Sequence, residues 1–476
     1  MFKVDFFKIL SGNIMGSILN FFNMLLLPPL FLHHLGEGNY ALWIYTLSIA
    51  SVFSFFNFGL SIYSINKLQI LFIKRSVLFN TVKNKLISGF IFINLVGLLT
   101  IIPLILLFTG DKILLMLMSI FIILANIKGI FVNLFRSYKR HHIGIYINNT
   151  YSLLLIIITI TVIFYDYGYY TLISSMIFLV LLTIALSILL LIKIMKFNFH
   201  INFDIKYIIL TLKRSSKFLS FDVSNYLKLQ VPIITIQYFL NPFSLILYTL
   251  HRTLSNAQYQ IVMILNNSLY QDIAKNFSLG SFDELRKIFL FQKKIILFIA
   301  SVSSMLIYIW YQNIMEFWIS DKFIDFLDIK ILSIFLLSTI LSSLWNGSTV
   351  FLSAINKHEK MSVYIIYYGI SISILSTIAL GFFGLYGLIY SLLFCELIFS
   401  FFIQRHVALF LGIPLISLIK VHFEMLVFLL IFVMILIIFD NKFYQSFLSL
   451  GFVSFLTYTT FDKQDVVLIK NFFQVN

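Results

Sequence analysis

Apolar residues occur in runs of roughly twenty, the length at which an α-helix crosses about 30 Å of hydrocarbon. Short polar or Gly/Pro-containing turns separate these runs. A membrane β-barrel would instead need alternating segments of about ten residues. We therefore predict an all-α, polytopic integral membrane protein with about 14 transmembrane helices (12 to 14), at 9–32, 40–64, 86–108, 113–135, 143–164, 171–192, 218–240, 244–269, 294–312, 329–352, 363–383, 386–404, 423–439 and 444–461.

Composition narrows the chemistry. Hydrophobic residues make up 60% of the chain and charged residues 11%, against about 25% charged in an ordinary soluble domain. The single cysteine, Cys395, excludes an internal disulfide and a cysteine-based metal cluster. The sequence contains neither a Gly-rich nucleotide loop nor a His-Glu metal motif. We therefore expect no enzyme activity, no catalytic residues, no metal site and no cofactor.

Basic residues indicate topology. A net charge of +15 would suggest nucleic acid in a soluble protein, but here most Lys and Arg lie in the connections between spans. When residues at the edge of a span are counted with the adjoining connection, the termini and even-numbered connections hold 27 of the 34, and the odd-numbered connections hold only four: Lys112, Lys322, Lys330 and Lys442. This is the positive-inside pattern. Both termini are therefore predicted to be cytoplasmic, and nucleic acid is not an expected partner.

The connections also predict the domains. We expect a six-helix bundle over 1–192, a cytoplasmic connection over 193–217, a second six-helix bundle over 218–404, and two extra helices with a cytoplasmic tail over 405–476. Asn20 and Leu35 are fifteen residues apart with Pro28 between them, and Asn225 and Leu240 repeat that spacing around Pro232. A parallel duplication of six-helix halves produces such an echo, although chance also can in so biased a composition.

The first helical hairpin carries a recognisable order of residues. Pro28 is followed by Leu35-Gly36, then Tyr40-Ala41-Leu42-Trp43, then Phe58-Gly59-Leu60. This order resembles the N-terminal pattern of O-antigen flippases, polysaccharide transporters of the multidrug/oligosaccharidyl-lipid/polysaccharide exporter (MOP) superfamily. The motif covers residues 1–65, and the rest agrees in architecture. Family members commonly carry an aspartate where this chain has Asn57, which puts in doubt an ion role at that position.

The resemblance implies two six-helix bundles around a central cavity, with two C-terminal helices added. The implied substrate is an undecaprenyl-diphosphate-linked oligosaccharide, turned from the inner to the outer leaflet of the bacterial plasma (inner) membrane. Membrane lipids and the polysaccharide polymerase are further expected partners. A diphosphate with sugar hydroxyls cannot cross hydrocarbon unaided, so such a protein needs a polar, preferably cationic, pathway.

Two consecutive spans carry charges at membrane depth. Asp222, Asn225 and Lys228 recur at helical spacing and so lie along one stripe. Arg252 and Asn256 follow in the next span. Arginine can fork two hydrogen bonds onto phosphate oxygens, and lysine supplies a point charge. Lys228, Arg252, Asn225 and Asn256 are therefore candidate substrate-binding residues. The structural alternative is that Asp222 neutralises Lys228, or that Arg252 pairs with a carboxylate for packing.

Three further ionisable residues have open roles. Lys128 lies in the fourth span and either extends to the inner headgroups or lines the substrate cavity. Glu396, mid-span in the twelfth helix, and Asp222 are candidates for carrying a coupling proton or sodium ion. Alternatively, Glu396 is a protonated carboxyl hydrogen-bonded to a neighbouring helix.

Two other functions compete with the flippase. A multidrug or metabolite exporter of the same superfamily would favour acidic residues in its cavity, whereas the deep charges here are mostly cationic. An O-antigen polymerase, a membrane enzyme, would present a sizeable outward loop with catalytic Arg or His residues. The longest outward connection predicted here runs only over 313–328.

Overall fold

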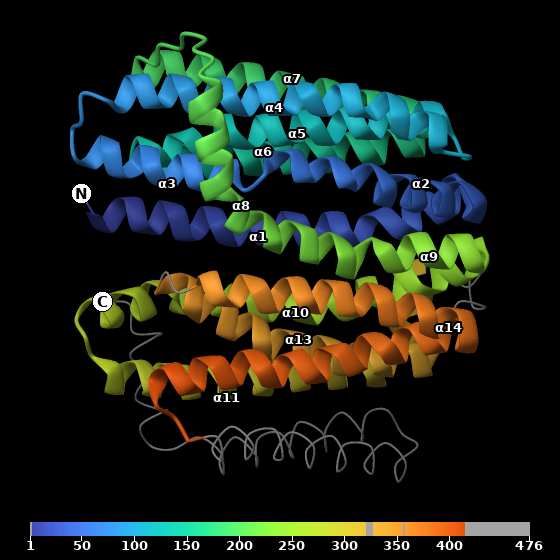
Figure 1. Cartoon of the computed structure of the whole chain (residues 1–476). Coiled ribbons are helices and arrows are strands. Elements are labelled where there is room, and N and C mark those ends of the chain that lie inside the picture. Colours follow the sequence, from blue (N-terminus) through green and yellow to red (C-terminus); the bar gives the residue numbers. More distant parts are fainter. Residues whose placement is uncertain (1, 320–326, 356–357, 415–476) are drawn as a thin grey trace. The chain divides into compact units, whose positions relative to one another are not determined.

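The computed structural model describes residues 2–319, 327–355 and 358–414, and this part of the chain is helical without β-strands (Figure 1). The predicted all-α membrane fold is confirmed. The last two predicted spans, 423–439 and 444–461, lie outside the described residues. The helices are α1 Phe2–His34, α2 Gly36–Ala50, the 3-10 helix η1 Ser51–Asn57, α3 Leu60–Ile73, α4 Phe79–Leu107, α5 Lys112–Ser137, α6 His141–Phe164, α7 Gly168–Met195, α8 Ile205–Leu229, α9 Val231–Phe239, α10 Pro242–Ser278, α11 Phe282–Ile309, α12 Tyr311–Ile319, α13 Ile329–Ala354 and α14 His358–Leu411.

Within the described residues, nine helical segments are long and apolar enough to cross a membrane. The predicted eleventh and twelfth spans are joined in α14, which breaks at Gly384 (φ 64°, ψ −153°). The predicted seventh and eighth spans correspond to α8 with α9 and to α10, which are not among the nine. Polar residues in α8 and α10 lower the hydropathy of these two helices below that of the nine segments. Most of the candidate site residues lie on these two helices.

The described residues form two compact units. The first contains the residues up to Ile246 together with Ile365–Thr377 of α14, and the second contains Leu247–Tyr364 and the described residues from Ile378 onward. We describe each unit by itself. The bundles expected over 1–192 and 218–404, and the separate segment after 404, stay predictions.

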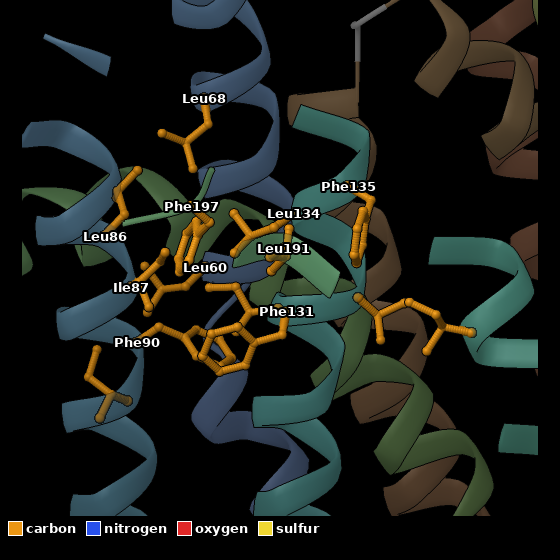
Figure 2. Close-up of a cluster of buried hydrophobic side chains, with 14 of the residues drawn as sticks. Leu60, Leu68, Leu86, Ile87, Phe90, Phe131, Leu134, Phe135, Leu191 and Phe197 are labelled. Atoms are coloured by element: carbon orange, nitrogen blue, oxygen red, sulfur yellow. The ribbon is translucent and has the colours of Figure 1, made fainter. Parts of the chain in front are cut away.

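The core of the first unit forms around α5, which packs against α2, α3, α4, α6 and α7. Burying large apolar side chains from several helices together removes them from both water and lipid. Figure 2 shows this cluster, in which α3 contributes leucines, α4 and α5 contribute phenylalanines, and α7 and the segment after it close one side. The labelled members are Leu60, Leu68, Leu86, Ile87, Phe90, Phe131, Leu134, Phe135, Leu191 and Phe197.

Small residues bring α1 and α6 together. Gly12 and Gly16 are four residues apart, and a Cβ at either would meet α6 side chains at 2.7 Å, Ile145 Cγ2 and Asn149 Oδ1 respectively. Asn149 Nδ2 donates to the Gly12 carbonyl oxygen at 2.8 Å. Such small-xxx-small pairs, joined by an amide hydrogen bond, are how membrane helices associate when lipid is as apolar as the helix surface.

The predicted second span, 40–64, is interrupted. It begins as α2, tightens into η1 and stops where Phe58 (φ 44°) and Gly59 (φ 65°) both adopt left-handed backbone. Asn126 Nδ2 of α5 donates to the Phe53 carbonyl of η1 at 3.1 Å, and the Asn57 side chain accepts the Ser61 N–H at 3.3 Å. The break is tolerated in the membrane because side-chain amides bond the irregular backbone.

The predicted seventh span also breaks. α8 ends at Leu229, α9 starts at Val231, and Pro232 is the reason, because it has no N–H to donate to the carbonyl four residues earlier. That carbonyl belongs to Lys228. Pro28 lies inside α1 without ending it, so the two halves treat this echoed proline differently.

The predicted connection 193–217 is held by lysines of the first unit. Lys83 is buried and donates to the Asn198 carbonyl at 2.7 Å, and Lys85 Nζ lies 2.7 Å from Asp204 Oδ2. Asp204 also caps α8 by accepting the Tyr207 N–H at 3.0 Å. Basic residues that indicate topology in the sequence therefore also bind the connection to α4.

The two units contain matching ties. Asp111 accepts the Leu114 N–H at the start of α5 and a phenolic hydrogen bond from Tyr170 of α7 at 2.5 Å. Asp328 caps α13 in the same way and accepts from Tyr386 of α14 at 2.6 Å. Both α5 and α13 are 26 residues long. These pairs join the fourth span to the sixth and the tenth to the twelfth, which supports a duplication of six-helix halves.

Candidate substrate site

The stripe on α8 lies just before the helix break. Asp222 and Lys228 are half-buried there, and Asn225 is exposed. The Lys228 ammonium lies 5.3 Å from the centroid of the Tyr368 ring. Tyr368 belongs to the part of α14 that is in the first unit and is almost fully buried.

The close packing of α8 against α14 places the Tyr368 ring beside Lys228. Ser224 Oγ donates to the Ile365 carbonyl at 2.6 Å, and Ser373 Oγ donates to the Leu227 carbonyl at 3.2 Å. A Cβ on Gly369 would meet Ser224 Cα at 2.8 Å, so only glycine fits between the two backbones. The lysine is thus positioned by two serine bonds and one glycine contact.

Lys128 is held across α5 and α6 of the first unit. Its ammonium lies 3.3 Å from the centroid of the Tyr151 ring, and Nζ donates to Asn148 Oδ1 at 3.4 Å. A tyrosine face attracts a cation through its quadrupole without neutralising it. Both of these contacts of Lys128 are with α6.

In the second unit, Arg252 lies above an aromatic ring of its own helix. Its guanidinium carbon is 5.8 Å from the centroid of the Tyr248 ring, one turn earlier on α10. Ser255 Oγ donates to the Arg252 carbonyl at 3.0 Å, and Asn256 follows on the next turn, half-buried like Arg252. A guanidinium carries five N–H donors, and two of them can fork onto the oxygens of one phosphate.

Glu396 is buried in the second unit and has a specific donor. The indole Nε1 of Trp345, on α13, donates to Glu396 Oε2 at 2.6 Å. Tyr259 of α10 is a close electrostatic neighbour of this carboxyl group. The hydrogen bond to a neighbouring helix that the sequence left as an alternative is therefore present, and it does not by itself exclude ion coupling.

The same spacing from a capping aspartate recurs in the two units. Trp345 is seventeen residues after Asp328, as Lys128 is after Asp111, and Glu396 is ten residues after Tyr386. The first unit thus has a cation at a helix position where the second has the donor for a carboxylate. Sequence reading missed Trp345, because a tryptophan in an apolar run has no signal that separates it from ordinary core.

A second group that the sequence did not single out surrounds Lys293. This fully buried lysine on α11 donates to the Leu344 carbonyl at 2.5 Å and to Ser348 Oγ at 2.6 Å. Beside it, Gln292 Nε2 donates to Asn266 Oδ1 at 3.0 Å. Lys293 comes one residue before a predicted span, so the positive-inside pattern explained it as a topology residue.

The candidate residues are thus divided between the units. Asp222, Asn225, Lys228 and Lys128 belong to the first, and Arg252, Asn256 and Glu396 belong to the second. Within the first unit, an intrahelical stripe and a separate lysine on α5 supply the charge. Within the second, the arginine and the buried carboxylate come from α10 and α14.

No known protein family has a sequence pattern that matches this chain, and no curated protein matches it in sequence. Solved structures do match. The lipid II flippase MurJ, in an inward closed conformation, aligns with 95% of this chain and 99% of its own at 17% identity and a TM-score of 0.66. An inward-facing multidrug resistance MATE family transporter of the MOP superfamily aligns with 83% of this chain and 94% of its own at 12% identity and a TM-score of 0.65.

A third match is a MOP superfamily transporter from Pyrococcus furiosus, described as having a binding pocket of reverse polarity. It covers 85% of this chain and 95% of its own, at 10% identity and a TM-score of 0.56. Identities this low establish the fold alone. The chain therefore has the fold shared by MOP-superfamily transporters and a lipid flippase.

Proposed function

We propose that this protein is a flippase of the bacterial plasma membrane, with both termini cytoplasmic. Its substrate is an undecaprenyl-diphosphate-linked oligosaccharide, an O-antigen repeat unit or a similar unit, which it moves from the inner to the outer leaflet by alternating access. The shared fold supports a transporter. The residues described above support an anionic substrate.

The setting of Lys228 and Arg252 carries this proposal. Each is half-buried in a predicted span and lies over a tyrosine ring. A cation at mid-bilayer depth costs at least about 2.5 kcal/mol on insertion scales, and a cation–π contact offsets about 0.5–2 kcal/mol of such a cost without removing the charge. Each of these cations attracts an anion such as a diphosphate and repels an organic cation.

The remaining candidate residues have supporting roles in the proposal. Lys128 adds a third cation, and Asn225 and Asn256 supply amide donors and acceptors for sugar hydroxyls. Asp222 and Glu396 carry the coupling ion, a proton or sodium. The polyprenyl tail stays in lipid, and the polysaccharide polymerase receives the flipped unit.

A multidrug or metabolite exporter is the second candidate, because MATE transporters share the fold. Such a protein would bind its cationic cargo with carboxylates, and Asp222 and Glu396 are the available ones. The two functions differ in which substitutions abolish transport. Removing the cations abolishes transport by a flippase, whereas in a cation exporter only removing the acidic residues does so.

Deleting the gene in its native host tests the proposal. We expect complete lipid-linked repeat units to accumulate on the inner leaflet, measured by extracting the lipids and probing their accessibility from outside. Single repeat units displayed outside without polymer would identify a polymerase instead. Unchanged lipid-linked intermediates with increased drug sensitivity would identify an exporter.

A further inference from the structure

Two basic residues of the first unit adopt left-handed backbone at neighbouring turns. Arg75 (φ 48°) lies in the α3–α4 turn, and Lys139 (φ 60°) lies in the α5–α6 turn. Both line one open pocket of about 450 Å³. Figure 1 shows the α3–α4 turn at the same end of the unit as the N-terminus, which the predicted topology places at the inner face.

The α10–α11 turn of the second unit has the same backbone hydrogen bonds as the α3–α4 turn, but with a glycine. There, the N–H of Gly280 bonds to the Phe277 carbonyl and that of Ser281 to the Asn276 carbonyl. The first unit repeats both bonds, with Arg75 in the place of Gly280 (φ 71°). Glycine adopts this conformation without strain, whereas a residue with a Cβ is strained by it. In turns of the same geometry, the first unit therefore has a cation where the second has a glycine.

Aromatic rings and an amide side chain line the pocket together with the two cations. Phe72 and Phe79 line it, and Tyr138 packs on both rings at centroid distances of 5.3 and 5.4 Å. Lys83 Nζ donates to Asn80 Oδ1 at 3.1 Å, which orients the Asn80 amide so that its NH2 group can donate elsewhere. Arg75, Lys139 and Asn80 thus surround a rigid aromatic floor with hydrogen-bond donors.

Two exposed aliphatic residues follow the pocket residues Arg75 and Ser76 in the chain. Val77 is 95% exposed and Leu78 is 61% exposed. Aliphatic side chains next to cations at the end of a membrane helix suit the boundary between acyl chains and headgroups. This combination favours a lipid over a soluble anion.

We propose that this pocket binds the phosphate of an anionic phospholipid headgroup of the inner leaflet. Arg75 and Lys139 contact the phosphate oxygens, and Val77 and Leu78 lie among the acyl chains. The alternative role of the two cations is to satisfy the carbonyl ends of α3 and α5. Lys196 ends α7 in the same backbone conformation (φ 49°), so an experiment has to separate the two roles.

Glycine substitution separates the two roles, because it removes the charge and relieves the backbone. The full-length protein and the Arg75→Gly/Lys139→Gly variant would be purified in detergent, and lipid binding measured by native mass spectrometry with phosphatidylglycerol, phosphatidylcholine and inorganic phosphate. We expect the native protein to prefer phosphatidylglycerol. The variant should lose at least about tenfold in affinity for it, as for a lost hydrogen bond to a charged group, while its unfolding temperature without lipid stays equal or rises.

A single pair of variants controls for net charge. Arg75→Gln should lose phosphatidylglycerol, whereas Lys74→Gln, which removes the neighbouring charge outside the pocket, should retain it. Equal binding by the native protein and the glycine variant would overturn the proposal, as would equal losses in both glutamine variants. If inorganic phosphate binds as tightly as phosphatidylglycerol, the ligand of the pocket is a soluble anion and the lipid proposal is wrong.

Discussion

Trp345 Nε1 donates to Glu396 Oε2 at 2.6 Å, joining α13 to α14 inside the second unit. Only Glu396 is ionisable. A substitution of Trp345 therefore tests the hydrogen bond, and a substitution of Glu396 tests the charge. An indole is a donor only, and removing it leaves a buried carboxyl group without this bond.

We expect Trp345→Phe to destabilise the protein by about 1–3 kcal/mol, the cost of losing one hydrogen bond to a buried carboxyl group. Thermal unfolding in detergent measures this. Glu396→Gln retains an acceptor for the indole and should be much less destabilising. If Glu396 carries the coupling ion, this variant is stable and abundant but produces no surface polysaccharide; normal polysaccharide would limit Glu396 to a structural role.

Lys228 and Arg252 should differ in which substitutions they tolerate without loss of transport. Lys228→Ala and Arg252→Ala are expected to abolish surface polysaccharide with near-normal protein abundance in the membrane. Lys228→Arg should retain much of the activity if a diffuse charge suffices, whereas Arg252→Lys should lose more because lysine cannot make a two-pronged phosphate contact. Lys112→Ala, which removes an exposed charge at the start of α5, is the matched control.

The structural alternative for Lys228 has its own signature. If Asp222 and Lys228 serve only each other, then neutralising both should restore transport that Lys228→Ala alone abolishes. Normal transport by the double variant Asp222→Asn/Lys228→Ala would remove Lys228 from the substrate site and leave the anion-binding role to Arg252.

Acid should loosen the connection before α8. The hydrogen bond from Lys85, with the Tyr207 N–H, lowers the pKa of the Asp204 carboxyl group below its ordinary value. Its contribution to stability is therefore fully present above that ordinary pKa and is lost as the pH falls through the lower folded-state value. We expect the protection factors for amide hydrogen exchange, which correct for slower intrinsic exchange in acid, to fall in residues 198–207 below about pH 4, in line with the unperturbed aspartate pKa. Asp204→Asn should remove this pH dependence; an unchanged profile would contradict it.

Topology can be measured directly. Cysteine at Lys74, Arg140 or Lys213 should react with a membrane-impermeant reagent only from the cytoplasmic side. Cysteine at Tyr165, an exposed residue after α6, should react only from outside. Tyr165 is preferable to Asp111, which caps α5. Labelling of both groups from the same side would refute the predicted orientation.

Sequence patterns predicted the membrane helices because span length depends on local chemistry: an apolar run of given length crosses a bilayer of given thickness. Nine helical segments of the described residues satisfy this criterion. The polar stripes of α8 and α10 were also visible, since spacing along a helix determines which side chains share a face. Pro232 and the Phe58–Gly59 pair were noted in the sequence, but they were not predicted to interrupt a helix. The predicted second and seventh spans ran through these positions without a break.

Only the tertiary structure decided what each polar residue does. Lys83 and Lys293 were counted as topology residues, yet they bond carbonyls 115 and 51 residues away in the chain. Trp345 became the donor for Glu396 because α13 packs beside α14, and Tyr368 reached Lys228 because a glycine lets two backbones approach. Such partners depend on how helices pack at contacts of a few ångströms, and periodicity along one helix contains no information about which helix lies opposite.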